Sequence, residues 1–91
     1  QAYIDKQEAQ RRELAAKIEI LRARAAKADA QARIRLNEQI EKLRKRESDY
    51  VEKIGQLKQA TGEAWKDLKG GIDSAWKELW GGVEKALDKF S

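Results

Sequence analysis

Neither proline nor glycine occurs in the first 54 residues of this chain. These two residues are the strongest helix breakers, and the residues that fill the segment, mainly Ala, Arg, Lys, Glu, Gln and Leu, favour helix. Acidic residues recur four positions before basic ones, as in Glu8–Arg12 and Glu38–Lys42, where each pair stabilises an isolated helix by about 0.2–0.5 kcal/mol. Strand-like alternation never persists. The sequence therefore predicts an all-α protein.

The apolar residues of this segment show which kind of helix to expect. From Ile4 they recur in alternating steps of three and four, the heptad spacing of a coiled coil. Two consecutive steps of four between residues 32 and 40 form a stutter, which locally unwinds a supercoil. Gln7, Arg11 and Glu47 lie on the same seam, and we expect them to set helix register or oligomeric state.

Residues 1–60 are thus predicted to form mostly one long helix, of about 90 Å at 1.5 Å per residue. The sequence leaves open whether the helix is interrupted at either of two places. Ser48 and Asp49, with Glu52 three positions after Asp49, have the residue types of a capping box. The other place is Gly62, after which the chain either continues the helix or folds back on it.

From residue 61 the period of the sequence changes to eleven. Residues 61–91 contain nearly three copies of one repeat, in which Trp65 aligns with Trp76. Eleven residues make three turns at 3.67 residues per turn, so the apolar stripe of an amphipathic helix would run almost straight. The large apolar side chains fill one arc of roughly 160° on a helical wheel. This arc is the predicted face for docking on a helix or on lipid: Trp65, Leu68, Ile72, Trp76, Leu79, Trp80, Val83, Leu87 and Phe90.

One edge of this arc carries only small residues. Small residues at helical spacing let a second helix approach closely. Glycine inside a helix also costs about 1 kcal/mol relative to alanine, so we expect this helix to gain its order chiefly by docking. The predicted close-packing ridge consists of Ala60, Ala64, Gly71, Ala75, Gly82 and Ala86.

The length of 91 residues allows one domain at most. Ile, Leu, Val and Phe together make up about a fifth of the chain, near the lower limit for a folded protein. Because a small domain buries little surface, we expect the core to be shared between chains in a homodimer or a higher oligomer.

The composition argues against an enzyme. Without Cys or His the chain lacks the commonest general base, the commonest soft nucleophile and the usual zinc and haem ligands. Its carboxylates lie among lysines on predicted solvated faces, where their pKa values are not split for catalysis. We therefore expect no cofactor, no metal and no small-molecule substrate. No apolar run approaches the ~20 residues of a membrane span, and a cytoplasmic location is the default expectation.

The net charge of +4 resides in residues 1–55, which contain a short basic cluster. Its functional interpretation is contact with nucleic-acid phosphates, and the alternative is a solvated face that neighbouring glutamates offset. Because the aromatic residues lie in another segment and no base-reading motif is present, nucleic-acid binding is the less favoured hypothesis. The candidate phosphate contacts are Arg33, Arg35, Lys42, Arg44, Lys45 and Arg46.

Three stretches, residues 2–10, 37–46 and 64–79, resemble a bacterial family of small coiled-coil proteins, some of which are described as stress-response proteins. The resemblance implies a non-enzymatic, cytoplasmic protein and supplies no catalytic residues. The 11-residue period is also similar to that of exchangeable apolipoproteins and of desiccation-protective proteins.

The leading hypothesis is therefore a structural or interaction protein that docks through the Trp-bearing face. The alternative is reversible binding of the same face to a membrane surface, because Trp and Phe beside Lys suit the membrane–water interface. Residues 56–91 carry six basic and six acidic groups, and this balance argues against strong attraction to anionic lipid.

Overall fold

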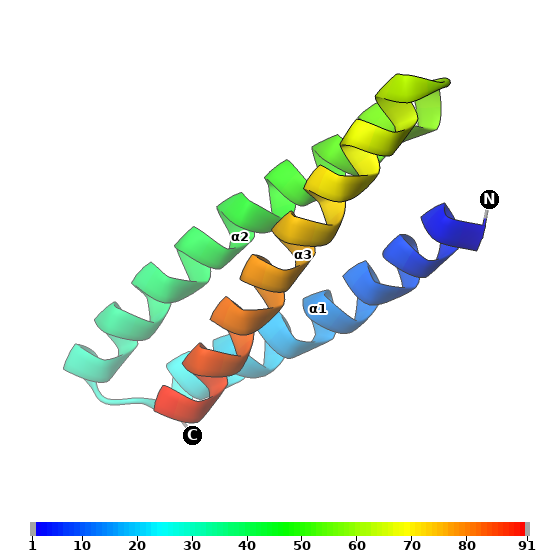
Figure 1. Cartoon of the computed structure of the whole chain (residues 1–91). Coiled ribbons are helices and arrows are strands. Elements are labelled where there is room, and N and C mark those ends of the chain that lie inside the picture. Colours follow the sequence, from blue (N-terminus) through cyan, green and yellow to red (C-terminus); the bar gives the residue numbers. More distant parts are fainter. Residues whose placement is uncertain (1, 91) are drawn as a thin grey trace.

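The computed structural model describes residues 2–90 as three helices, α1 (Ala2–Lys27), α2 (Ala30–Gln59) and α3 (Glu63–Lys89). α1 and α3 run in the same direction and α2 runs in the opposite one, so that the chain forms an elongated up-down-up bundle (Figure 1). The bundle measures 51 × 18 × 17 Å. Residues 2–90 contain no strand, and the predicted all-α fold is confirmed.

A tight turn at Ala28 and Asp29 separates α1 from α2. Asp29 is the N-cap of α2: its backbone is extended (φ −68°, ψ 171°), and its Oδ1 accepts a hydrogen bond of 2.9 Å from the backbone N–H of Ala32. Arg33 folds back and donates from its guanidinium to the carbonyl oxygen of Ala28 at 3.1 Å. The prediction of one long helix over residues 1–60 is therefore wrong, because the Asp29 side chain satisfies helix donors that a continuous helix would have paired internally.

The two sites at which a break was left open have different outcomes. Ser48 and Asp49 lie inside α2, so the chain does not turn at the capping-box sequence. The chain does turn at Ala60–Gly62, where α3 folds back along α2. Gly62 has φ 61°, in the left-handed region that favours glycine because it has no Cβ.

The core runs along the axis of the bundle and receives residues from all three helices. Helical spacing of the apolar residues places one face of each helix toward this axis. The buried hydrophobic residues are Leu14, Ile18, Leu21 and Ala25 on α1, Leu36, Ile40, Leu43, Tyr50, Ile54 and Leu57 on α2, and Ile72, Leu79, Val83 and Ala86 on α3. The apolar face of α3 is thus covered by α1 and α2 of the same chain.

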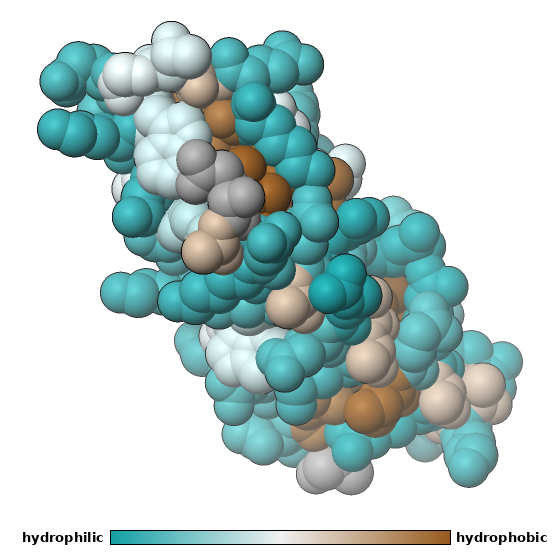
Figure 2. Space-filling view, turned by 90° about the vertical axis from the view of Figure 1, so that its right-hand side faces the viewer, coloured by the Kyte–Doolittle hydropathy of each residue, from teal (hydrophilic) through white to brown (hydrophobic). Residues whose placement is uncertain are grey.

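This intramolecular core removes the physical reason for expecting an oligomer, because no second chain is needed to cover α3. Hydrophilic residues dominate the face of the molecule drawn in Figure 2, and hydrophobic residues appear there in narrow strips between them. Self-association stays a prediction without that support. Within residues 2–90 no helix combines the length and the hydrophobicity that crossing a lipid bilayer requires.

Candidate functional site

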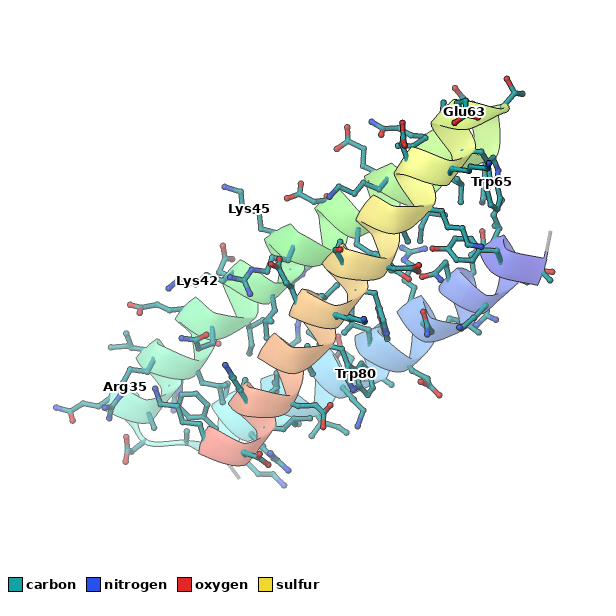
Figure 3. The ribbon with its side chains drawn as sticks, in the orientation of Figure 1. Arg35, Lys42, Lys45, Glu63, Trp65 and Trp80 are labelled. Atoms are coloured by element: carbon teal, nitrogen blue, oxygen red, sulfur yellow. The ribbon has the colours of Figure 1, made fainter. Side chains whose placement is uncertain are left out.

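The predicted docking face of α3 points into the bundle. Its central residues Ile72, Leu79 and Val83 are fully buried. The other six are partly buried and pack around the core: Trp65, Leu68, Trp76, Trp80, Leu87 and Phe90. Figure 3 shows Trp65 and Trp80 on the side of α3 that faces α1. We call the edge formed by Trp65, Trp76 and Trp80 the indole edge.

Aromatic rings continue the indole edge onto the other two helices. Trp76 and Trp80, one helical turn apart, stack with ring centroids 5.2 Å apart. Trp76 also packs against Tyr50 of α2 at 5.5 Å, and Trp65 meets the edge of Tyr3 of α1 at 5.7 Å. These separations are those of favourable aromatic pairs, worth about 0.5–1.5 kcal/mol each beyond burial.

Polar contacts connect α1 to this edge. The hydroxyl of Tyr3 donates to Oδ1 of Asp73 at 2.7 Å and lies 3.2 Å from the carbonyl oxygen of Lys69. Burial, together with the hydrogen bond to Asp73, raises the pKa of Tyr3 above its usual value. Further along, the ammonium of Lys17 lies 5.0 Å from the ring centre of Trp80, a cation–π distance. The α1–α3 contact is therefore largely polar at the indole edge.

At the other end of α1, Arg24 donates to the carbonyl oxygen of Leu87 at 2.9 Å, near the C-terminus of α3. The last carbonyls of a helix lack partners within the helix and carry partial negative charge. Arg24 therefore holds the ends of the two parallel helices together through a favourable charge contact.

The opposite edge of α3, the close-packing ridge, lies toward α2. A Cβ built on Gly82 would lie 3.0 Å from Cδ2 of Leu43, so the two helices approach closely here and a larger residue would force Leu43 to shift. Ala86 is buried, whereas a Cβ on Gly71 would meet nothing within 4 Å. Of the other ridge positions, Ala60 and Ala75 are partly buried and Ala64 is exposed. The predicted tight contact thus occurs in the C-terminal half of the ridge.

A buried polar pair lies beside the indole edge. The hydroxyl of Tyr50 donates to Oε1 of Gln7 at 2.5 Å, and Gln7 is 2% exposed. Burial, with a smaller contribution from the negative charge of Asp73, raises the pKa of Tyr50 to about 12. Gln7 was predicted as a polar seam residue, but its partner could not be read from the sequence. The other two seam residues behave differently, since Arg11 is exposed and Glu47 is partly buried.

The first three turns of α1, residues 2–11, meet the indole edge at Trp65, through Tyr3, and make few apolar contacts. Tyr3 and Ile4 are only partly buried, and the next seam positions are Gln7 and Arg11. Oε1 of the neighbouring Gln10 is buried without a hydrogen-bond partner. By contrast, the following seam residues of α1 are Leu14, Ile18 and Leu21, all buried. The part of α1 that lies over Trp65 is therefore its least apolar part.

The structure does not bring the six predicted phosphate contacts together. All six are exposed on α2, but they point to different sides of it. Arg35, Lys42 and Lys45 project away from the bundle in Figure 3. Arg44 lies beside Arg11 and Arg22 on the α1 side, Arg46 lies in a groove on the α3 side, and Arg33 bonds to the end of α1.

The acidic side chains of residues 2–90 are spread along the helices. Residues 2–90 contain no group of three acidic side chains that could hold a metal ion. Glu8 forms an exposed ion pair of 2.6 Å with Lys58, and this hydrogen bond lowers the pKa of Glu8.

The sequence resembles no protein-family model, and comparisons with curated proteins and with solved structures found no match.

Proposed function

We propose that this chain is a non-enzymatic helical-bundle interaction protein whose docking surface is the indole edge of α3. The observation that carries the proposal is the polar cover of that edge. Trp65 and Trp76 are only partly buried. Tyr3 of α1 packs against Trp65 and is hydrogen-bonded to Asp73, and Gln7 of α1 is hydrogen-bonded to Tyr50, the ring that packs against Trp76. Moving such a polar segment away from α3 costs less free energy than moving an apolar one, because its polar groups then form hydrogen bonds to water.

The partner that fits this surface is a helix with an apolar seam. It would take the position of residues 2–11 and bury the Trp rings more completely than the present cover does. The contact between α2 and α3 would stay in place, since Gly82 and Leu43 pack closely there. Local opening of one segment while the remainder stays folded is common where a segment makes few buried apolar contacts.

Native-state hydrogen exchange on the full chain tests the opening. We expect amide hydrogens of residues 4–11 to exchange through a local opening that leaves residues 14–25 and α2 protected. A double variant, Gln7→Leu with Tyr50→Phe, replaces the polar pair by an apolar one and should suppress this opening and the acrylamide quenching of Trp fluorescence. If all of α1 exchanges with one common free energy, the proposed docking surface is not separately accessible.

Lipid is the competing occupant of the same edge, since Lys17 and Lys69 lie beside the indole rings as at a membrane interface. Adding vesicles to the full chain separates the two occupants. A blue shift of Trp fluorescence on neutral or anionic vesicles, abolished in the closed double variant, would favour the lipid alternative over a helix. A role in stress responses stays a prediction from the family resemblance.

A further inference from the structure

A groove between α2 and α3 concentrates positive charge. It is lined by Gln39 and Arg46 of α2 and by Lys77, Lys85 and Lys89 of α3, with Glu78 as its one acidic residue. The ion pairs Arg22–Glu19 and Lys58–Glu8 do not include any of these four cations. Like charges that line one groove repel one another, and an anion bound along the groove would relieve this repulsion.

Two adjacent glycines of α3 line the groove. Gly81 and Gly82 lie at its centre, between Lys77 and Lys85. Gly82 packs closely against Leu43, and Arg46 Nη1 lies 3.5 Å from the position of a Cβ on Gly82. A Cβ on Gly81 would meet nothing within 4 Å, so packing does not explain this second glycine, which costs the helix about 1 kcal/mol. A ligand can therefore approach the α3 backbone at Gly81, while Arg46 lies over Gly82.

The length of the groove indicates an extended polyanion. Lys77 and Lys89 are separated by twelve residues of α3, which is about 18 Å of helix. No single phosphate reaches both ends, whereas consecutive phosphates of one nucleic-acid strand extend over such a length. Phe90 lines the same groove, with the Lys89 ammonium 5.6 Å from its ring centre, and proteins that bind single strands combine aromatic rings with basic groups in this way.

We infer that the α2–α3 groove binds the backbone of single-stranded nucleic acid, with Arg46, Lys77, Lys85 and Lys89 as phosphate contacts. The groove includes only Arg46 of the six basic residues that the sequence singled out. It shares no residue with the indole edge, so this inference is independent of the proposed function. The grooves between α1 and α2 are weaker candidates, because Glu41 and Glu47 offset Arg11, Arg22 and Arg44 there.

Fluorescence anisotropy with a labelled single-stranded oligonucleotide and the full chain tests the inference. Four phosphate contacts give a slope of log K against log salt of about −3. The triple variant Lys77→Gln, Lys85→Gln and Lys89→Gln should weaken binding more than tenfold at low salt and reduce the slope by about two. The matched variant Lys6→Gln, Lys27→Gln and Lys66→Gln removes the same charge from exposed positions outside the groove and should keep the slope.

Two single variants separate an effect on the groove from a loss of folding: a loss of folding cannot strengthen binding, and a matched glycine of α3 serves as the control for the second variant. Glu78→Gln should strengthen binding, because it removes the one negative charge in the groove. Gly81→Leu should obstruct the groove and weaken binding, whereas Gly70→Leu, also in open space on α3, should not. Equal weakening by the two triple variants, absence of salt-sensitive binding, or equally strong competition by anionic phospholipid vesicles would each overturn the inference.

Discussion

Tyr50 of α2 donates a hydrogen bond to the side chain of Gln7 of α1 in a position where both residues are almost completely buried. Removing one partner leaves the other without its bond, at a cost of about 1–3 kcal/mol, whereas replacing both by apolar groups of similar shape can be nearly neutral. We expect Gln7→Leu alone to destabilise the fold by about 1–3 kcal/mol, and Gln7→Leu with Tyr50→Phe to be at least as stable as the better single variant. Urea unfolding of the wild type, the two single variants and the double variant measures the coupling energy between Gln7 and Tyr50. If the losses of stability in the single variants add up to that of the double variant, the pair contributes nothing.

The turn between α1 and α2 depends on the Asp29 cap. Asp29→Ala should lower the free energy of unfolding by about 0.5–2 kcal/mol, because the first N–H groups of α2 lose their acceptor. Asp49→Ala is the matched control, since Asp49 is exposed inside α2. That change should be neutral or slightly stabilising. If thermal unfolding shows that Asp49→Ala lowers the stability more than Asp29→Ala does, the turn does not lie at Asp29.

Adjacent glycines of α3 should respond differently to alanine. Gly81→Ala meets open space and should stabilise the fold by about 1 kcal/mol. Gly82→Ala gains the same helix propensity but brings its Cβ to within 3.0 Å of the buried Leu43, so it should be clearly less stable than Gly81→Ala. Chemical unfolding ranks the two variants, and equal gains would show that α2 and α3 do not approach closely at this point.

Alkaline pH should destabilise the bundle through its two tyrosines. Burial raises the pKa of Tyr50 to about 12, and the pKa of Tyr3 is raised as well, so the folded state favours the neutral phenols. Their contribution to stability is therefore complete below the usual pKa of about 10 and is lost as pH rises from there toward 12. Urea unfolding across this range should show the decline, and Tyr50→Phe should make it shallower. An unchanged slope in that variant would contradict the assignment.

The helices themselves could be predicted from the sequence, because good helix formers and the absence of breakers act locally. The turn at Ala28 and Asp29 was missed because neither Gly nor Pro marks it. Asp29 has the spacing of an ion pair with Arg33, but the structure uses its carboxylate as a cap and directs Arg33 to Ala28. The features of the sequence that could have indicated this turn were the stutter and the run of small seam residues around position 28.

The site was predicted in part. The 11-residue period identified the indole edge and the ridge, since both follow from helical geometry. Which residues cover the indole edge and the ridge depends on which helices lie beside α3. That arrangement could not be predicted because the turn at Ala28 and Asp29, which separates α1 from α2, was missed. The same turn places α2 beside α3 and brings Arg46 near Lys77 and Lys85, residues far apart in the chain. Helix periodicity alone cannot show such a groove.

The up-down-up path places the first and last described residues at opposite ends of a bundle 51 Å long (Figure 1). A hairpin of two helices, or of four, would return the chain to the end where it started. Any polypeptide joined before Ala2 and any joined after Phe90 would therefore be held apart by the length of the bundle. Joined in this way, the three helices would act as a rigid spacer between two attachment points.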